Sequence, residues 1–257
     1  MWMYAEKNIK NQTIIYSEYK YESKQHNIEM LLDSQEFSDF LSHLNQSYNI
    51  VIWWDGTMLH ALKNYNKNGK KYIWINFWNK WFLLQDKKII LQKNNFIEKK
   101  YSIFDIQIND SHFDSFINEV SISAKNWKMW AFEIQLWQNE SFELHWDWFV
   151  VSTPIWSTAY NSSLWGPILS HHSKSLVITP KAPWKPRHFP SIVIPENEKI
   201  HIKNIWRFHG LEIHCDGQSK HIDEKNDEIT IIKSQVELVF AIAQSQEKKW
   251  ENKIFEF

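Results

Sequence analysis

The sequence is short of glycine, arginine and cysteine. Only 5 of its 257 residues are glycine, the only arginines are Arg187 and Arg207, and Cys215 is the single cysteine. One cysteine excludes a disulfide scaffold, and 29 basic against 30 acidic side chains exclude a polybasic nucleic-acid arm. No apolar run approaches the roughly 20 residues that a membrane-spanning helix needs. We therefore expect a globular protein with no nucleic-acid and no membrane partner.

The start of the chain lacks the features of a secretory signal. Residues 1–11 do not show the positively charged stretch followed by an apolar stretch that such a signal requires. We expect the protein to stay in the reducing cytoplasm, with Cys215 as a free thiol. The length allows one large domain or two of modest size.

Tryptophan is as abundant as glycine is scarce. The sequence has 16 tryptophans, whereas a domain of this length normally carries about 18 glycines. Lysine, asparagine and isoleucine are frequent and arginine is rare, which is the bias of an A/T-rich genome. Some bacteria read the UGA triplet as glycine, and a widely used alternative translation table prints it as tryptophan. Our interpretation is that most printed tryptophans are biological glycines. The alternative is a truly tryptophan-rich protein whose exposed rings would bind sugars or peptides.

The first third of the chain has the pattern of an α/β domain. Residues 29–44 carry apolar side chains at the spacing of an amphipathic helix. Residues 48–52 form an apolar, β-branched run typical of a buried parallel strand, and a small-residue loop and a predicted helix over 58–65 follow. A second unit repeats this order, with a strand over 71–76 and a loop over 78–82. Strand, loop and helix in this order predict a phosphate-binding layout.

Beyond residue 89 the pattern changes to alternating stretches. Segments such as 132–136, 192–194 and 229–232 predict antiparallel strands, because apolar side chains recur at every second position. We place a domain boundary within 86–98. The predicted parts are an α/β domain over 1–92, a β-rich domain over 93–235, and a C-terminal segment over 236–257 that we expect to pack back on the first domain.

The loop after the first predicted parallel strand is where glycine matters most. A loop that wraps phosphates brings backbone N–H groups close to the ligand, often at positive φ, and only glycine does both without a steric cost. The indoles of Trp53 and Trp54 would fill the space that the phosphates require. Read as glycines, they precede Asp55, Gly56 and Thr57 in a G-G-D-G-T loop. This loop resembles the hallmark of the NAD kinase family.

Further segments are similar to family motifs once tryptophan is read as glycine. Residues 74–82 resemble G-I-N-x-G-x-x-G-F, and residues 118–120 contain the family's N-E pair. The most specific match is 145–167, which is similar to the G-D-G, S-T-P-T-G-S-T-A-Y and G-G-P motifs. Residues 178–183 and 216–218 resemble the I-T-P-x-A-P and D-G-Q segments. The tryptophans that fall on family glycines are Trp53, Trp54, Trp74, Trp78, Trp81, Trp146, Trp148, Trp156 and Trp165.

The resemblance covers residues 48–220 and implies both a fold and an activity. It implies a Rossmann-like α/β first domain, an antiparallel, β-sandwich-like second domain and an active site between them. The implied reaction transfers the γ-phosphoryl group of ATP or polyphosphate to the adenosine 2′-hydroxyl of NAD, giving NADP. Mg²⁺ is expected to arrive with the ATP, so no set of protein metal ligands is predicted. Family members assemble as dimers or tetramers, so a homodimer or homotetramer is expected.

The resemblance also implies roles for single residues. Asp55 is expected near the adenosine 2′-hydroxyl as the general base, where position matters more than basicity. Asn118 and Glu119 are expected to hydrogen-bond the adenosine and its ribose, and Asp147 the ribose on the nicotinamide side. The remaining expected site residues are Trp53, Trp54, Gly56 and Thr57 in the phosphate loop, and Thr158, Ala159 and Tyr160 in the dinucleotide pocket.

Some positions depart from the family pattern. Ile155 stands where the family usually has threonine or serine, so we expect a hydroxyl contact to adenine to be missing. Asn79 and Lys80 replace the more typical arginine and leucine after the second loop.

Three alternatives remain open. A lipid kinase of the diacylglycerol or sphingosine type shares the G-G-D-G-T loop but lacks the block that residues 152–160 match. If every tryptophan is real, the chain is a catalytically inactive nucleotide-binding protein or a tryptophan-rich ligand-binding protein. His209, His214 and Cys215 would suggest a metal site, but no second cysteine supports it.

Overall fold

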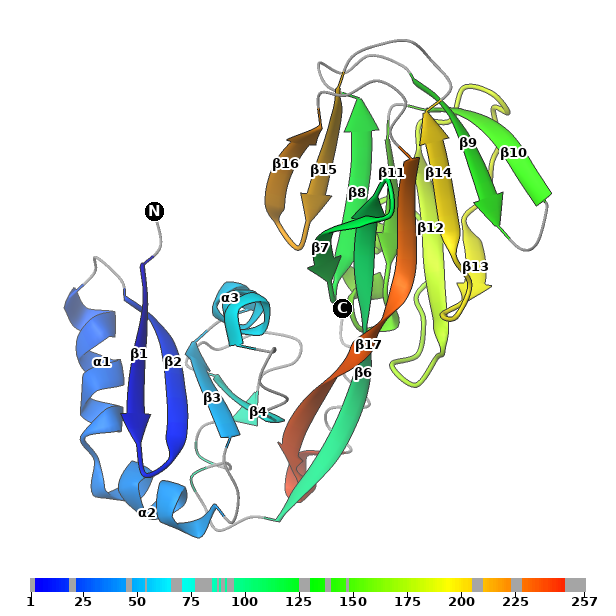
Figure 1. The fold of residues 1–257 in the computed structure, drawn as a ribbon. Helices are drawn as coiled ribbons and strands as arrows, with labels where there is room; N and C mark the ends of the chain where they lie inside the picture. Colours follow the sequence, from blue (N-terminus) through cyan, green and yellow to red (C-terminus); the bar gives the residue numbers. More distant parts are fainter. Residues whose placement is uncertain are drawn as a thin grey trace. The chain divides into compact units, whose positions relative to one another are not determined.

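Parallel strands organise the first part of the chain in the computed structural model (Figure 1). β3 (Tyr48–Trp53) pairs in parallel with both β2 (Gln12–Glu18) and β4 (Lys71–Asn76). β5 (Gln85–Asp86) continues the sheet beside β4, and β1 (Met3–Ile9) adds an antiparallel edge to β2. The apolar run that predicted a buried parallel strand is therefore confirmed as β3.

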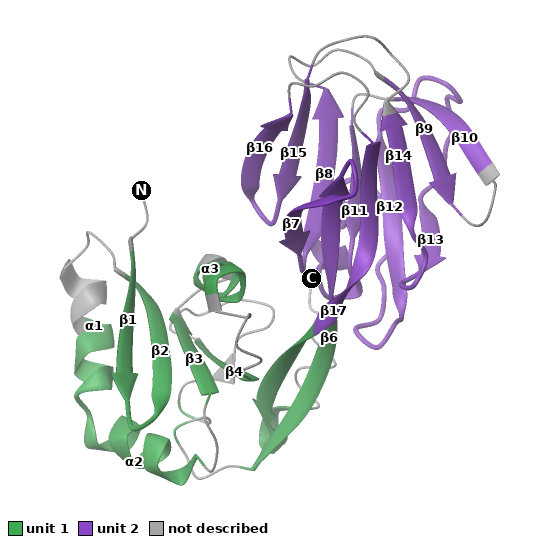
Figure 2. Ribbon diagram, viewed as in Figure 1, with its two compact units in different colours: residues 1–101, 237–257 green, residues 102–236 purple. Residues whose placement is uncertain are grey.

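The chain divides into two compact units (Figure 2). Unit 1 comprises residues 1–101 and 237–257, and unit 2 comprises residues 102–236. β6 (Phe96–Ile108) and β17 (Glu228–Ala243) contribute residues to both units. The structure describes residues 3–18, 22–44, 48–53, 55–65, 71–76, 85–86, 88, 91, 95–124, 130–136, 140–146, 148–204, 210–222 and 228–247.

The helices of unit 1 depart from the sequence pattern, and α3 begins at Asp55 although the pattern placed its start at residue 58. They are α1 (Glu22–Leu32), α2 (Gln35–His43) and α3 (Asp55–Tyr65). The sequence predicted one helix over 29–44, whereas the structure breaks it at Asp33 and Ser34. The Ser34 hydroxyl accepts a hydrogen bond from the Phe37 N–H at 3.2 Å and so caps a new helix, whose apolar face is buried. No helix in the described part of the chain is both long and apolar enough to span a membrane.

Unit 2 consists of antiparallel strands. Besides β6 and β17, its strands are β7 (Ser111–Phe116), β8 (Glu119–Ala124), β9 (Trp130–Leu136), β10 (Glu140–Trp146), β11 (Trp148–Ser152), β12 (Ser175–Lys181), β13 (Ile192–Pro195), β14 (Ile200–Asn204), β15 (Leu211–Cys215) and β16 (Gln218–Ile222). One sheet has the order β13-β12-β11-β8-β15-β16. In the other sheet, β14 pairs with β9 and β17, β9 pairs with β10, and β6 pairs with β7 and β17.

A shared apolar core joins the two sheets of unit 2. Buried side chains from one sheet, such as Phe132 and Ile134, belong to the same cluster as Phe149 and Ile213 from the other. The Phe132 and Phe149 rings meet edge to face with centroids 5.6 Å apart. Two antiparallel sheets that share a core form a β-sandwich-like unit. The expected order, an α/β unit followed by an antiparallel β-rich unit, is therefore confirmed.

We predict that Ile134→Ala destabilises unit 2 strongly. Ile134 is fully buried in the shared core, and its truncation leaves a cavity, so the free energy of unfolding should fall by about 2–5 kcal/mol. Val193→Ala is the control, because Val193 is 46% exposed and its truncation should cost about 0.5 kcal/mol or less. Urea denaturation followed by circular dichroism measures both. Equal losses would contradict the packing described above.

Candidate functional site

Asn118 and Glu119 lie where β7 ends and β8 begins, and Asp216 holds their backbone from the turn after β15. The Asp216 carboxylate accepts hydrogen bonds from the N–H groups of Ile117 (3.0 Å), Asn118 (2.9 Å) and Glu119 (3.3 Å). The Asp216 N–H donates in turn to the Glu119 carbonyl at 3.1 Å. After β11, the Thr153 N–H donates to the Asn118 carbonyl at 2.9 Å, and its hydroxyl donates to the Ile117 carbonyl at 2.6 Å. Two distant parts of the chain therefore fix this short segment.

The Glu119 side chain is largely buried, and its Oε2 atom has no hydrogen-bond partner among the described residues. Burial first, and the nearby charge of Asp216 second, raise the pKa of Glu119 from 4.5 to about 8. Near neutral pH the carboxyl therefore keeps its proton and is able to donate a hydrogen bond. Asn118 beside it is buried as well. A buried acid with an unpartnered oxygen indicates a binding site for a polar ligand.

Tyr160 lies near Glu119 and contacts Trp148. Burial first, and the charge of Glu119 second, raise the pKa of the Tyr160 hydroxyl. The Tyr160 ring meets the Trp148 indole edge to face, with centroids 6.0 Å apart. The Lys181 ammonium lies 3.7 Å from the centroid of the same indole. An indole at position 148 therefore fills space that borders both Tyr160 and Lys181.

Hydrogen bonds from Asn161 organise the chain after β11. There the chain forms two short helical turns, η3 (Pro154–Trp156) and η4 (Ser157–Asn161). The Asn161 Nδ2 donates to the carbonyls of Ser157 at 3.0 Å and Pro167 at 2.9 Å. Its Oδ1 accepts from the Thr179 hydroxyl at 2.6 Å. The buried amide thus joins the start of η4, the following loop and β12.

Gly166 follows this turn and has no room for a side chain. A Cβ there would lie 2.0 Å from Asn161 Oδ1 and 2.6 Å from the Thr179 hydroxyl oxygen. The preceding residue, Trp165, has φ +62°, a left-handed conformation that favours glycine, and it is 95% exposed. The backbone therefore requires glycine at 166 and favours it at 165.

The structure brings several predicted dinucleotide residues together in unit 2. Thr158, Ala159 and Tyr160 all lie in η4, and Tyr160 is close enough to Glu119 for the charge of that residue to act on its hydroxyl. Ala159 has φ −94° and ψ −115°, outside the helical region, so the turn is kinked at this residue. Asp147 lies outside the described residues.

The predicted phosphate loop belongs to unit 1, between β3 and α3. Trp53 ends β3 and Asp55 begins α3. Thr57 is fully buried, and its hydroxyl oxygen lies 3.0 Å from the hydroxyl oxygen of Ser17 in β2. A helix N-terminus offers free N–H groups and the positive end of the helix dipole, which suit a phosphate group. Outside the described part lie Trp54 and the side chains of Trp53 and Asp55.

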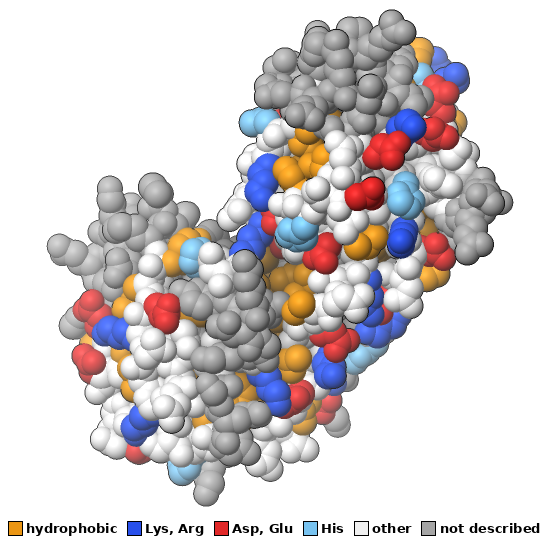
Figure 3. Space-filling model, viewed as in Figure 1, with side chains coloured by type: hydrophobic (Ala, Val, Ile, Leu, Met, Phe, Trp, Pro, Cys, Tyr) orange, Lys and Arg blue, Asp and Glu red, His pale blue; other side chains and the backbone are white. Residues whose placement is uncertain are grey.

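The side chains proposed for a metal site have other contacts. The described residues contain no group of three or more His, Cys, Asp or Glu that could hold a metal ion. His214 Nδ1 lies 2.7 Å from the Ser219 hydroxyl, and the buried Cys215 thiol donates to the Ser115 carbonyl at 3.2 Å. His209 lies outside the described residues. On the face shown in Figure 3, acidic and basic side chains are interspersed over each unit.

The sequence alone indicated no role for Asp216, Asn161 or Thr179, although all three lie inside segments that resemble family motifs. Each is buried and polar, and each hydrogen-bonds a segment that is distant in the chain or follows a turn. The signal that pointed to Asp216 was its place before Gly217 in a turn. That signal indicates backbone geometry and does not reveal which amides the carboxylate meets.

The comparisons with known proteins agree on one family. The pattern of the ATP-NAD kinase C-terminal domain matches residues 117–242. The NAD kinase of Wigglesworthia glossinidia brevipalpis is 34% identical over 196 residues, which cover 72% of this chain and 66% of that protein. The NAD kinase of Flavobacterium psychrophilum is 31% identical over 217 residues, which cover 77% of this chain and 72% of that protein. This chain belongs to the NAD kinase family.

Solved structures share the fold of this NAD kinase family member. A crystal structure of an NAD kinase from Archaeoglobus fulgidus in complex with ATP superposes with a TM-score of 0.70 at 21% identity, covering 95% of this chain and 98% of that one. A yeast NADH kinase complexed with NADH gives a TM-score of 0.72 at 15% identity, covering 95% and 86%. The chain spans about two thirds of the length of the Wigglesworthia relative. The family match includes residues 118–119, η4 and Asp216.

We predict that Gly166→Ala costs more stability than Gly217→Ala. At 166 the new methyl group would collide with Asn161 and Thr179, so the free energy of unfolding should fall by about 3 kcal/mol. At 217 nothing lies within 4 Å, and the strain of φ +76° should cost about 1 kcal/mol. Urea denaturation of the two variants tests the difference. A loss at 166 no larger than that at 217 would show that the turn has room for a side chain.

We also predict that Glu119→Gln changes how stability depends on pH. Because the pKa of Glu119 rises from 4.5 to about 8 on folding, the folded state holds a proton that the unfolded state releases within this window. The stability of the wild type should therefore fall as pH rises, by about 1.4 kcal/mol per pH unit, and this slope should be absent in the variant. Urea denaturation across the window measures the slopes. Glu36→Gln, on the exposed face of α2, is the control and should keep the wild-type slope.

Proposed function

We propose that this chain is an NAD kinase that transfers the γ-phosphoryl group of ATP to the adenosine 2′-hydroxyl of NAD, giving NADP. One observation carries the proposal: the buried Asn118–Glu119 pair is fixed by Asp216 and lies near Tyr160, within the stretch that matches the family. Family membership supplies the reaction class. The relatives are named NAD kinases, and the solved structures hold ATP or NADH.

The residues of unit 2 bind the dinucleotide in this proposal. Asn118 and Glu119 hydrogen-bond the adenosine and its ribose, whose hydroxyls both donate and accept. Asp147 binds the ribose on the nicotinamide side. Thr158, Ala159 and Tyr160 line the pocket, with the Tyr160 ring as a stacking face. The half-buried position of Tyr160 beside Glu119 supports this assignment.

The residues of unit 1 carry the phosphoryl transfer. The backbone amides of residues 53–57, at the start of α3, hold the donor phosphates. Asp55 accepts the proton of the 2′-hydroxyl as its oxygen bonds to the γ-phosphorus, and the bond from that phosphorus to the bridging oxygen breaks to release ADP. Mg²⁺, which arrives with ATP, neutralises charge on the transferred group. The described residues contain no group of three or more His, Cys, Asp or Glu that could hold a metal ion.

We infer further that the native chain carries glycine at the nine motif positions printed as tryptophan. Trp165 has a left-handed φ of +62°. Trp148 fills space beside Tyr160, which the dinucleotide would need. Trp74 is 2% exposed in β4, and its Nε1 has no hydrogen-bond partner among the described residues, which is costly for a buried N–H group. Each observation supports glycine at a position where the family has it.

We propose a homodimer or homotetramer in the cytoplasm, with polyphosphate as a second donor. The family resemblance supports these assignments. Size-exclusion chromatography with light scattering would test the assembly, and an assay with polyphosphate in place of ATP would test the donor.

We predict that the chain with glycine at the nine motif positions makes NADP from NAD and MgATP. In that chain Asp55→Asn should lower kcat by about 10²–10⁴, because the general base is lost. The chain with tryptophan at all nine should make none, because an indole is too large for the positions at 53, 54 and 156, where the family has glycine. Enzymatic cycling of NADP measures all three. NADP formation by the tryptophan chain would refute the glycine assignment, and full activity of Asp55→Asn would refute the role of Asp55.

A matched control uses the other tryptophans. A chain with glycine at the seven remaining positions, and tryptophan kept in the motifs, should stay inactive. Mass spectrometry of the native protein decides the residues directly, and the peptide spanning residues 146–165 reports four of the nine positions together. Tryptophan in that peptide would favour the tryptophan-rich binding protein instead.

A further inference from the structure

Asp216 is a buried acid that connects two segments far apart in the sequence. It is 6% exposed and lies in the turn between β15 and β16 with φ +48°. The N–H groups that donate to its carboxylate, at residues 117–119, lie 97 to 99 positions away in the sequence. A buried carboxylate is stable only when it is hydrogen-bonded or paired. The contact is therefore specific, and it acts on the backbone of residues 117–119.

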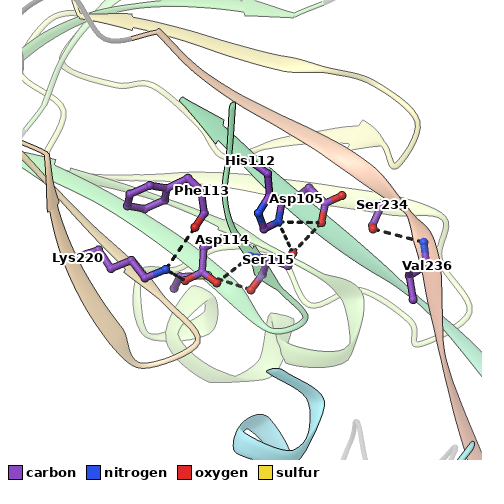
Figure 4. A network of polar contacts seen from close by, with 9 residues as sticks. Asp105, His112, Phe113, Asp114, Ser115, Lys220, Ser234 and Val236 are labelled. Carbon is purple, nitrogen blue, oxygen red and sulfur yellow. Dashed lines mark hydrogen bonds and ion pairs between the residues drawn. The ribbon is translucent and has the colours of Figure 1, made fainter. Parts of the chain in front are cut away.

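The hairpin of β15 and β16 also holds β7, the strand that leads into this segment (Figure 4). The Lys220 ammonium, from β16, lies 3.0 Å from the Asp114 carboxylate of β7. The Ser115 hydroxyl donates to the Asp105 carboxylate of β6 at 2.7 Å. β7 is thus anchored to strands on both sides, and Asp216 fixes the residues that follow it. The position of residues 117–119 therefore depends on their hydrogen bonds to Asp216.

We propose that Asp216 is a positioning residue for NAD: its carboxylate sets the backbone of residues 117–119 so that the Asn118 and Glu119 side chains meet the adenosine and its ribose. This proposal rests on the proposed function, which gives those two side chains their ligand. Asp216 acts through the backbone and does not itself contact NAD. The geometry requires a carboxylate, because both oxygens accept N–H donors and an amide nitrogen cannot.

The charge of Asp216 has a second effect, on the Glu119 side chain. After burial, it is the second cause of the raised pKa of Glu119. Tyr160, from η4, is the other titratable group whose shift involves Glu119. A neutral residue at 216 should therefore lower the pKa of Glu119, and the pH dependence of NAD use should move to lower pH with it. A purely structural role would change stability without moving that pH dependence.

The test compares Asp216→Asn with Asp110→Asn in the full-length, active chain. Asparagine tolerates the left-handed turn at both sites, since Asp110 has φ +63°, and Asp110 is exposed in the turn between β6 and β7. Asp216→Asn should raise the KM for NAD about tenfold and leave the KM for ATP within about twofold. The inflection of kcat/KM for NAD that reports Glu119 should shift to lower pH. Asp110→Asn should change none of these.

Two ligand-free measurements separate this proposal from the proposed function. Amide hydrogen exchange should show residues 117–119 protected in the wild type and exposed in Asp216→Asn, and carboxyl NMR should show Glu119 titrating at lower pH in the variant. If both measurements give the expected result but the wild type makes no NADP, the proposed function is wrong, whereas the contact between Asp216 and residues 117–119 is confirmed. If the wild-type amides exchange as fast as the Asp110 turn, the proposal is wrong even where the variant does not fold. An unchanged KM for NAD with an unchanged inflection would overturn it as well.

Discussion

The backbone of residues 117–119 in unit 2 depends on one buried carboxylate, that of Asp216. Residues 117–119 connect β7 to the start of β8, and the Asp216 carboxylate accepts hydrogen bonds from their N–H groups. The reverse dependence is as strong, because these donors offset the cost of burying the charge. Thr153, which follows β11, donates two further hydrogen bonds, from its N–H to the Asn118 carbonyl and from its hydroxyl to the Ile117 carbonyl. The position of Asn118 is therefore set by three segments that meet only in the folded chain.

Glycine is the second constraint, and it acts through space as well as through φ. At Gly166 the limit is steric, because Asn161 and Thr179 occupy the place of a Cβ. At position 165 the limit is conformational, because φ is +62° while the side chain points into solvent. The same turn therefore contains one glycine that is printed as such and one position that behaves like glycine while printed as tryptophan. This contrast supports the interpretation that the tryptophan at 165 is a biological glycine, and it does so without relying on motif resemblance.

The sequence predicted what local patterns encode and missed what long-range contacts decide. The apolar run of β3 was readable because buried parallel strands have a characteristic local composition. The break between α1 and α2 was missed because one serine hydroxyl outweighs a continuous apolar period. The contact of Asp216 with Asn118 was not predictable, since 98 residues separate them and hydrogen bonds of this kind leave no periodic trace. Motif resemblance pointed to Asn118 and Glu119, but only the fold shows what holds their backbone.

The unequal surroundings of Glu119 and Asp216 decide which of the two acids keeps a proton. Hydrogen bonds donated to a carboxylate favour its ionised form, and Asp216 receives them from the backbone, whereas Glu119 is buried with an unpartnered oxygen. The proton therefore stays on Glu119, in accord with its pKa of about 8. A neutral carboxyl presents one donor and one acceptor, and the hydroxyls of a ribose also donate and accept. Burial first, and the charge of Asp216 second, thus keep the proton on Glu119, and the neutral carboxyl offers the donor and the acceptor that the proposed contact with a ribose requires.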